Sequence, residues 1–61
     1  MRTIFEIKDE RAGDTNFSAV TRWYYKRLIR AIDRRGIPFR VGTLYVNGYP
    51  IKQLTILKAA S

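Results

Sequence analysis

The sequence predicts an α+β domain in which a three-stranded antiparallel sheet carries one amphipathic, basic helix packed on one face. Three observations support this prediction. The first segment alternates polar and apolar residues, the middle of the chain has helical periodicity, and the last third contains the hairpin signal Asn47-Gly48. The predicted order is β-α-β-β, and 61 residues leave room for a single small domain, 1–61.

The first predicted strand covers about residues 2–8. Thr3, Phe5 and Ile7 fall on one side of the alternation, and charged residues occupy most of the other side. This is the period of a half-buried strand. The polar stretch 9–14 contains Gly13 and is predicted to be a loop.

The predicted helix runs from about residue 17 to residue 35. Asn16 or Ser18 is the expected N-cap, because a side-chain oxygen there can accept a hydrogen bond from a free N–H of the first turn. At the other end Gly36 is expected to be left-handed and Ile37 to pack on Ile32, as in a Schellman motif. The apolar residues fill one half of the helical wheel: Val20, Tyr24, Tyr25, Leu28, Ile29, Ala31 and Ile32.

The predicted hairpin consists of strands at about 39–46 and 50–57. Pro50 cannot donate to a strand ladder, so the loop is expected to extend beyond the two residues of the turn. A tight turn would leave both faces of the hairpin apolar. One face would carry Phe39, Val41, Leu54 and Ile56, and the other Leu44, Val46, Tyr49 and Ile51.

One helix can cover only one of these two faces. Either a bulge near Gly42 changes the register, or another molecule buries the second face. A chain of this size has little core to stabilise it alone. We therefore expect a homodimer that forms through the face with Leu44, Val46 and Ile51.

The chain is strongly basic, with 12 Lys and Arg against 5 Asp and Glu and a net charge of +7. The cations gather on the polar half of the predicted helix, and Trp23 lies among them. Such a surface attracts a phosphate backbone, and an exposed tryptophan can stack on a base. The predicted binding residues are Arg22, Trp23, Lys26, Arg27, Arg30, Arg34 and Arg40, with Tyr45, Tyr49 and Lys52 as a secondary set.

Each of these features also has a purely structural explanation. The cations could form a solvated face that complements the helix dipole, with Asp33 paired to Arg30. Arg27 and Arg30 could cover Trp23 by cation–π contact, or a rotation of the helix could bury Trp23 in the core. The two hairpin tyrosines could form a cross-strand pair.

The pattern as a whole predicts a small nucleic-acid-binding protein, with DNA rather than RNA as the partner and phosphates as the main contacts. The alternative is a small accessory protein of the phage or plasmid type. It would use the same helix face to bind and to inhibit or modulate an acidic host protein.

The composition argues against several other classes. With no cysteine and no histidine, the chain has no disulfide, no zinc site and no histidine-based acid–base catalysis. We therefore expect no enzyme, no cofactor and no bound metal. No apolar run approaches the ~20 residues that span a membrane. Charged residues follow soon after Met1, so no signal peptide is expected and the predicted location is the cytoplasm.

Overall fold

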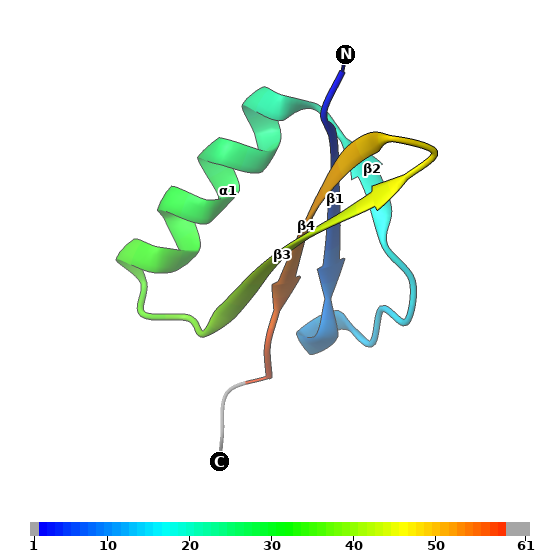
Figure 1. Cartoon of the computed structure of the whole chain (residues 1–61). Coiled ribbons are helices and arrows are strands. Elements are labelled where there is room, and N and C mark those ends of the chain that lie inside the picture. The colour runs from blue at the N-terminus through cyan, green and yellow to red at the C-terminus, as the bar shows by residue number, and fades with distance from the viewer. Residues whose placement is uncertain (1, 59–61) are drawn as a thin grey trace.

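The computed structural model describes residues 2–58 as one helix packed on a four-stranded sheet (Figure 1). The α+β class is therefore confirmed, although the sheet differs from the prediction. The elements in chain order are β1 (Ile4–Asp9), the short 3-10 helix η1 (Glu10–Ala12), β2 (Ser18–Val20), α1 (Arg22–Arg34), β3 (Phe39–Val46) and β4 (Tyr49–Ile56).

The sheet is mixed, and its strand order is β2-β1-β4-β3. β1 pairs with β2 in antiparallel fashion and with β4 in parallel fashion. The predicted three-stranded antiparallel sheet is wrong in both respects, and one cause explains both. The chain reverses direction at β2, before α1 begins. Because of this additional reversal, β3 and β4 each run in the direction opposite to the predicted one, and β4 lies parallel to β1 (Figure 1).

β2 occupies residues that were predicted to begin the helix. Val20 pairs with Phe5, and Ser18 pairs with Ile7. The helix begins instead at Arg22, and Thr21 is its N-cap, with the side-chain Oγ1 accepting a hydrogen bond of 3.2 Å from the backbone N of Tyr24. The predicted caps Asn16 and Ser18 are therefore wrong.

The predicted end of the helix is confirmed. Gly36 has a φ of 70°. The backbone N of Ile37 donates to the carbonyl of Ile32 at 2.9 Å, and that of Gly36 donates to Asp33 at 3.1 Å. This pair of hydrogen bonds defines a Schellman motif. It directs Ile37 onto the core beside Ile32.

The hairpin turn is the tight, two-residue turn that Asn47-Gly48 favours. Both residues have positive φ, 51° and 81°, as a type I′ turn requires. β4 begins at Tyr49, one residue before the predicted start, so the expected extension of the loop beyond the two turn residues is wrong. Pro50 pairs with Tyr45 next to the turn, and pairing with β1 begins only at Ile51. Its missing N–H therefore interrupts neither ladder.

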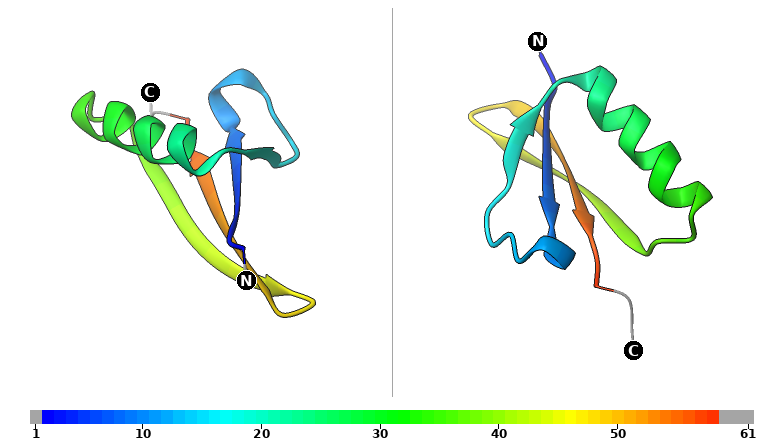
Figure 2. Two further views of the ribbon diagram at one scale, coloured as in Figure 1. Left: turned by 90° about the horizontal axis from the view of Figure 1, so that it is seen from above. Right: turned by 180° about the vertical axis from the view of Figure 1, so that it is seen from behind.

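The core lies between α1 and one face of the sheet (Figure 2). The Phe5 and Tyr25 rings make contact with their centroids 4.8 Å apart. Tyr24 belongs to the apolar half of the predicted helix and was therefore expected in the core, but it is exposed. The buried core residues are Phe5, Tyr25, Ile32, Leu54 and Ile56.

The opposite face of the sheet, here called the open face, has no helix over it in the described part of the chain. Pairing between β3 and β4 is continuous from Phe39–Ile56 to Val46–Tyr49, so the bulge considered near Gly42 is absent. The two faces of the hairpin are apolar as predicted. The hairpin tip also projects beyond α1 (Figure 2). The apolar residues exposed on the open face at this end are Ile4, Leu44, Val46 and Tyr49.

The other end of the open face is polar and partly covered. The Lys8 Nζ lies 5.1 Å from the centroid of the Phe17 ring, which brings the loop before β2 over this end. Gln53 donates a 2.8 Å hydrogen bond to Glu6, its partner on β1. The uncovered apolar surface is therefore confined to the hairpin end.

Candidate nucleic-acid interface

A shallow groove runs along the solvent side of α1. The spacing of three and four residues places its lining side chains on one stripe of the helix. Five of the seven primary residues predicted from the sequence meet there, with Ala31 between them. The lining consists of Trp23, Lys26, Arg27, Arg30, Ala31 and Arg34.

Trp23 is 66% exposed, so the interpretation that places it in the core is wrong. The guanidinium carbon of Arg27 lies 5.2 Å from the centroid of the Trp23 ring, within the range of a cation–π contact. This confirms that Arg27 contacts the ring. The large exposed fraction nevertheless leaves much of the indole accessible to a partner.

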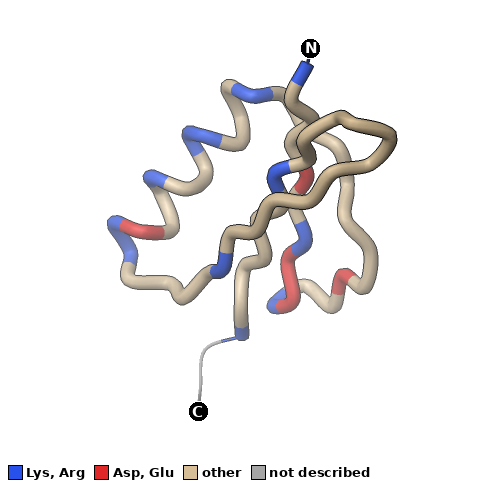
Figure 3. The backbone as a smooth tube through the Cα atoms, viewed as in Figure 1, with Lys and Arg blue, Asp and Glu red and all other residues tan. Residues whose placement is uncertain are grey.

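The cations of α1 have no acidic partner among residues 2–58. The salt bridges in this part of the chain are Lys8–Glu10 and Arg11–Asp9, both near η1. Asp33 forms no salt bridge with Arg30, contrary to the expectation. Figure 3 shows basic positions repeated along α1, with the single acidic position near its C-terminal end. The positive charge of this face is therefore uncompensated.

Arg22 and Lys52 lie at a second concavity, between the start of α1 and the sheet, and Lys26 lines both hollows. Lys52 is brought there because it pairs with Phe5 across the parallel β1–β4 ladder. Lys52 of the secondary set thus lines the same concavity as Arg22 and Lys26 of the primary set. Arg2, which the sequence analysis did not select, lines the same concavity.

Arg40 lies apart from these residues. It pairs with Thr55 and lines a hollow with Lys8 and Phe17 on the open face. Strand parity explains this position, because Phe39 faces the core and the next residue must face the other way. The structure therefore does not bring Arg40 together with the groove.

Tyr45 and Tyr49 are both exposed, but they lie on opposite faces of the hairpin. Tyr45 pairs with Pro50, whereas Tyr49 pairs with Val46. The predicted cross-strand pair of tyrosines is wrong, and the two rings cannot form one stacking surface. Tyr45 shares the helix-side face with Lys52.

Among residues 2–58, no group of three or more acidic side chains is arranged to hold a metal ion. The helix in this part of the chain is neither long enough nor apolar enough to cross a bilayer. Comparison with protein-family models, curated proteins and solved structures finds no match to this chain.

Proposed function

We propose that this protein binds nucleic acid through the groove on α1, with DNA preferred to RNA and phosphates as the main contacts. The observation that carries the proposal is the uncompensated charge of Lys26, Arg27, Arg30 and Arg34 beside the exposed Trp23. Each phosphate that such a cation neutralises releases a counterion, which favours binding at low salt.

The dimensions of α1 suit a nucleic-acid backbone. Arg27 and Arg34 are separated by roughly 10 Å along the axis at 1.5 Å per residue. This is about the axial rise of three nucleotides of one strand. A helix of about 10–12 Å diameter also fits the major groove of B-DNA, whereas the major groove of A-form RNA is too narrow. These dimensions support DNA as the partner.

We infer that sequence recognition is weak. α1 has no Asn or Gln that could pair with an adenine edge. Trp23 would contribute by stacking on a base or a sugar, which tolerates any sequence. Phosphate contacts and stacking together describe a protein that binds nucleic acid with little discrimination between sequences.

We propose binding without catalysis. Two of the acids near η1, Asp9 and Glu10, are engaged by Arg11 and Lys8. The lack of histidine and cysteine removes imidazole bases and thiol nucleophiles. The lack of cysteine also accords with a reducing compartment, and we place the protein in the cytoplasm as part of the same proposal.

The second candidate function is binding to an acidic protein surface, as an inhibitor or accessory protein of the phage or plasmid type. The favouring observation is the apolar part of the groove, to which Trp23 and Ala31 contribute among the arginines. Tryptophan and arginine are the residue types that dominate protein interfaces energetically. A protein partner would leave affinity for bare DNA weak at physiological salt.

We also propose that two copies associate through the hairpin end of the open face. Within residues 2–58, β3 is the last strand of the sheet, and its outer edge is unpaired over all eight residues. In a face-to-face contact, Leu44 and Val46 of one copy would cover the same residues of the other. Pairing of two copies along the β3 edge is the competing geometry. The dimer would place two basic grooves on one particle, on its two outer sides.

The test of the proposed function is the salt dependence of DNA binding. We expect Arg27→Ala with Arg30→Ala to weaken binding of a 20-base-pair duplex by about tenfold or more at low salt. The slope of log K against log salt should fall by about 2. Fluorescence anisotropy at several salt concentrations measures both quantities.

The matched control is Arg40→Ala with Lys58→Ala, which removes the same charge. Arg40 lies on the open face and Lys58 follows β4, and neither residue lines the groove. We expect this variant to lose less affinity than the groove variant. An unchanged slope in the groove variant would contradict phosphate contact by Arg27 and Arg30. A weak, shallow salt response of the unmodified protein would favour the acidic protein partner.

A further inference from the structure

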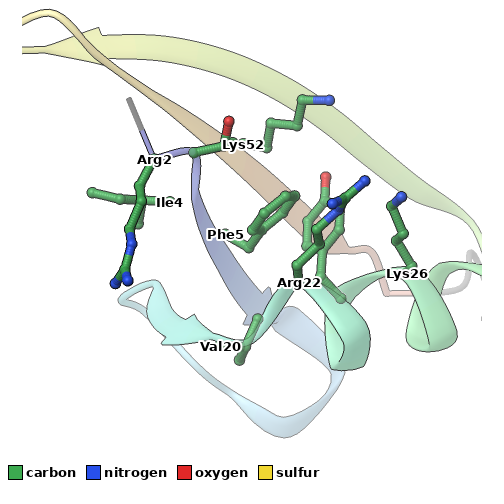
Figure 4. Close-up of a pocket in the computed structure, with 9 residues that line it drawn as sticks. Arg2, Ile4, Phe5, Val20, Arg22, Lys26 and Lys52 are labelled. Carbon is green, nitrogen blue, oxygen red and sulfur yellow. The ribbon is translucent and has the colours of Figure 1, made fainter.

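The concavity at the start of α1, here called the α1–β4 pocket, has features that the groove lacks. Of the nine residues that line it, four are basic and none is acidic. Figure 4 shows the ends of the Arg22, Lys26 and Lys52 side chains on one side of Phe5, whereas the Arg2 side chain points away from them. Three cations therefore line the same side of the pocket.

The fold brings these three cations to the pocket from distant parts of the sequence. Arg22 and Lys26 are one turn apart on α1, and both lie near β1 and β4. Lys52 lies beside Phe5 because β1 and β4 are parallel neighbours. None of the three forms a salt bridge within residues 2–58, so their mutual repulsion is not relieved by an acid there. A bound anion would relieve it.

The pocket also contains an unused hydrogen-bond donor. Tyr25 lines it and is only 4% exposed. Its hydroxyl is buried and has no hydrogen-bond partner among the described residues. Burial raises the pKa of the Tyr25 hydroxyl, so it stays protonated and able to donate at neutral pH. A buried hydroxyl without a partner is unfavourable unless something else satisfies it.

We propose that the α1–β4 pocket binds a phosphomonoester, the terminal phosphate of a nucleic-acid strand. Arg22, Lys26 and Lys52 hold its charge, and the Tyr25 hydroxyl donates a hydrogen bond to a phosphate oxygen. The inference rests on the proposed nucleic-acid binding and adds a specific site to it.

The charge favours a terminal phosphate over an internal one. A phosphomonoester carries about −1.5 to −2 at pH 7, whereas a backbone phosphodiester carries a single negative charge. Three cations on one side of a pocket suit the more highly charged group. Lys26 lines both the pocket and the groove, so a strand that follows the groove reaches the pocket at its end.

The test uses the full chain and one hexanucleotide in three forms: 5′-phosphorylated, 3′-phosphorylated and unphosphorylated. We expect one phosphorylated form to bind at least about fivefold more tightly than the unphosphorylated form, as measured by calorimetry at constant salt. Equal affinity for all three forms overturns the proposal. Inorganic phosphate is the fourth probe, and an affinity equal to that of the preferred hexanucleotide overturns the assignment to a strand end.

Two variants show whether the preference comes from this pocket. Tyr25→Phe keeps the ring that packs on Phe5 and removes only the hydroxyl, while Lys52→Gln removes one cation. We expect both to reduce the affinity ratio between the preferred and unphosphorylated forms to nearly one. Arg40→Gln removes one positive charge, as Lys52→Gln does, but on the open face, so it should leave this affinity ratio unchanged. A ratio that survives in Tyr25→Phe and Lys52→Gln overturns the proposal.

Thermal unfolding separates this role from a structural one. Tyr25→Phe should unfold at the same or a higher temperature, because it removes a buried donor that has no partner. The proposed function is tested independently by the 20-base-pair duplex. Steep salt dependence on the duplex with no preference among the hexanucleotides overturns the pocket alone, and absence of binding to any DNA overturns both.

Discussion

The Arg27 guanidinium lies 5.2 Å from the centre of the Trp23 ring, one helical turn further along the same exposed stripe. Neither side chain contributes to the core between α1 and the sheet. The Trp23 ring is not held by burial, so its contact with Arg27 is what fixes its position on the surface. A partner therefore meets an indole and a cation that are already positioned together, which lowers the entropy cost of binding.

Replacement of Trp23 by alanine should separate binding from stability. We expect Trp23→Ala to reduce the free energy of unfolding by about 1 kcal/mol or less, because an exposed cation–π pair contributes about 0.5–1 kcal/mol. Affinity for single-stranded DNA should fall roughly five- to hundredfold, the range for loss of one stacked base. Urea unfolding and anisotropy measure the two effects.

Trp23→Phe is the conservative control and should retain part of the affinity. Because Trp23 is the only tryptophan, the intrinsic fluorescence reports on it directly. Acrylamide should quench the free protein efficiently and the DNA complex less. Emission of the free protein that resists quenching, with a stability loss of ~3 kcal/mol in Trp23→Ala, would place the ring in a core.

Gly36 and Gly42 form a matched pair for testing the helix end. A Cβ at either position would meet no atom within 4 Å, but only Gly36 has a positive φ, 70°. Gly36→Ala should therefore cost about 1 kcal/mol through backbone strain alone. Gly42→Ala should change stability by less than about 0.5 kcal/mol or increase it. Chemical denaturation compares them, and equal losses would contradict the Schellman end.

The Asp9–Arg11 pair should make stability depend on pH in the acid range. Arg11 donates hydrogen bonds of 3.0 and 2.9 Å from its guanidinium and one of 3.0 Å from its backbone to the Asp9 carboxylate. The side-chain hydrogen bonds from Arg11 are the main cause that lowers the pKa of Asp9. A carboxyl with a lowered pKa stabilises the fold above its unfolded value of about 3.9, and this contribution is lost as pH falls.

Asp9→Asn should therefore be less stable than the unmodified protein at pH 7, and the difference should shrink as the pH falls below about 4. The pair is largely exposed, so salt should reduce the difference as well. Asp14→Asn has the same charge change at a residue without a salt bridge among residues 2–58. Thermal melts from pH 2 to 7 compare the variants, and a difference that grows toward low pH would contradict this sign.

The signals that predicted the structure correctly are those contained within a few residues. Asn47-Gly48 determines a two-residue turn. The length of this turn fixes the register of the hairpin, and the register determines which residues share a face. Gly36 and Ile37 similarly determine the helix end. These features depend on local backbone geometry, which is why no knowledge of the rest of the fold was needed.

β2 was missed because its three residues lie in a stretch rich in N-cap oxygens, where Asn16 and Ser18 favour a helix start. Its pairing with β1 is a tertiary contact that no local pattern contains. Without β2, the positions of two predicted binding residues could not be predicted either. The approach of Lys52 to Arg22 depends on the parallel β1–β4 ladder, and the separation of Arg40 from α1 depends on which face the helix covers.

The homodimer is best tested with two valines of equal exposure on one strand. Val41 and Val46 are each 46% exposed, but Val41 lies on the helix-side face of β3 and Val46 on the open face. We expect sedimentation equilibrium at micromolar concentration to give twice the monomer mass for the unmodified protein. Val46→Asp should shift the mass toward the monomer, because it places a charge inside the apolar contact.

Val41→Asp introduces the same charge at the same exposure and should leave the dimer largely intact. Leu44→Asp, in the row with Ile4 and Ile51, should act as Val46→Asp does and also reduce stability. If the two valine variants dissociate equally, the contact follows the β3 edge and does not involve the open face. If the unmodified protein sediments as a single species of monomer mass at high concentration, the dimer is excluded. Ile51, which was expected in the dimer contact, is only 8% exposed in the single copy. Cross-strand packing of Ile51 with Ile4 and Leu44 would then be enough to keep this row stable in water.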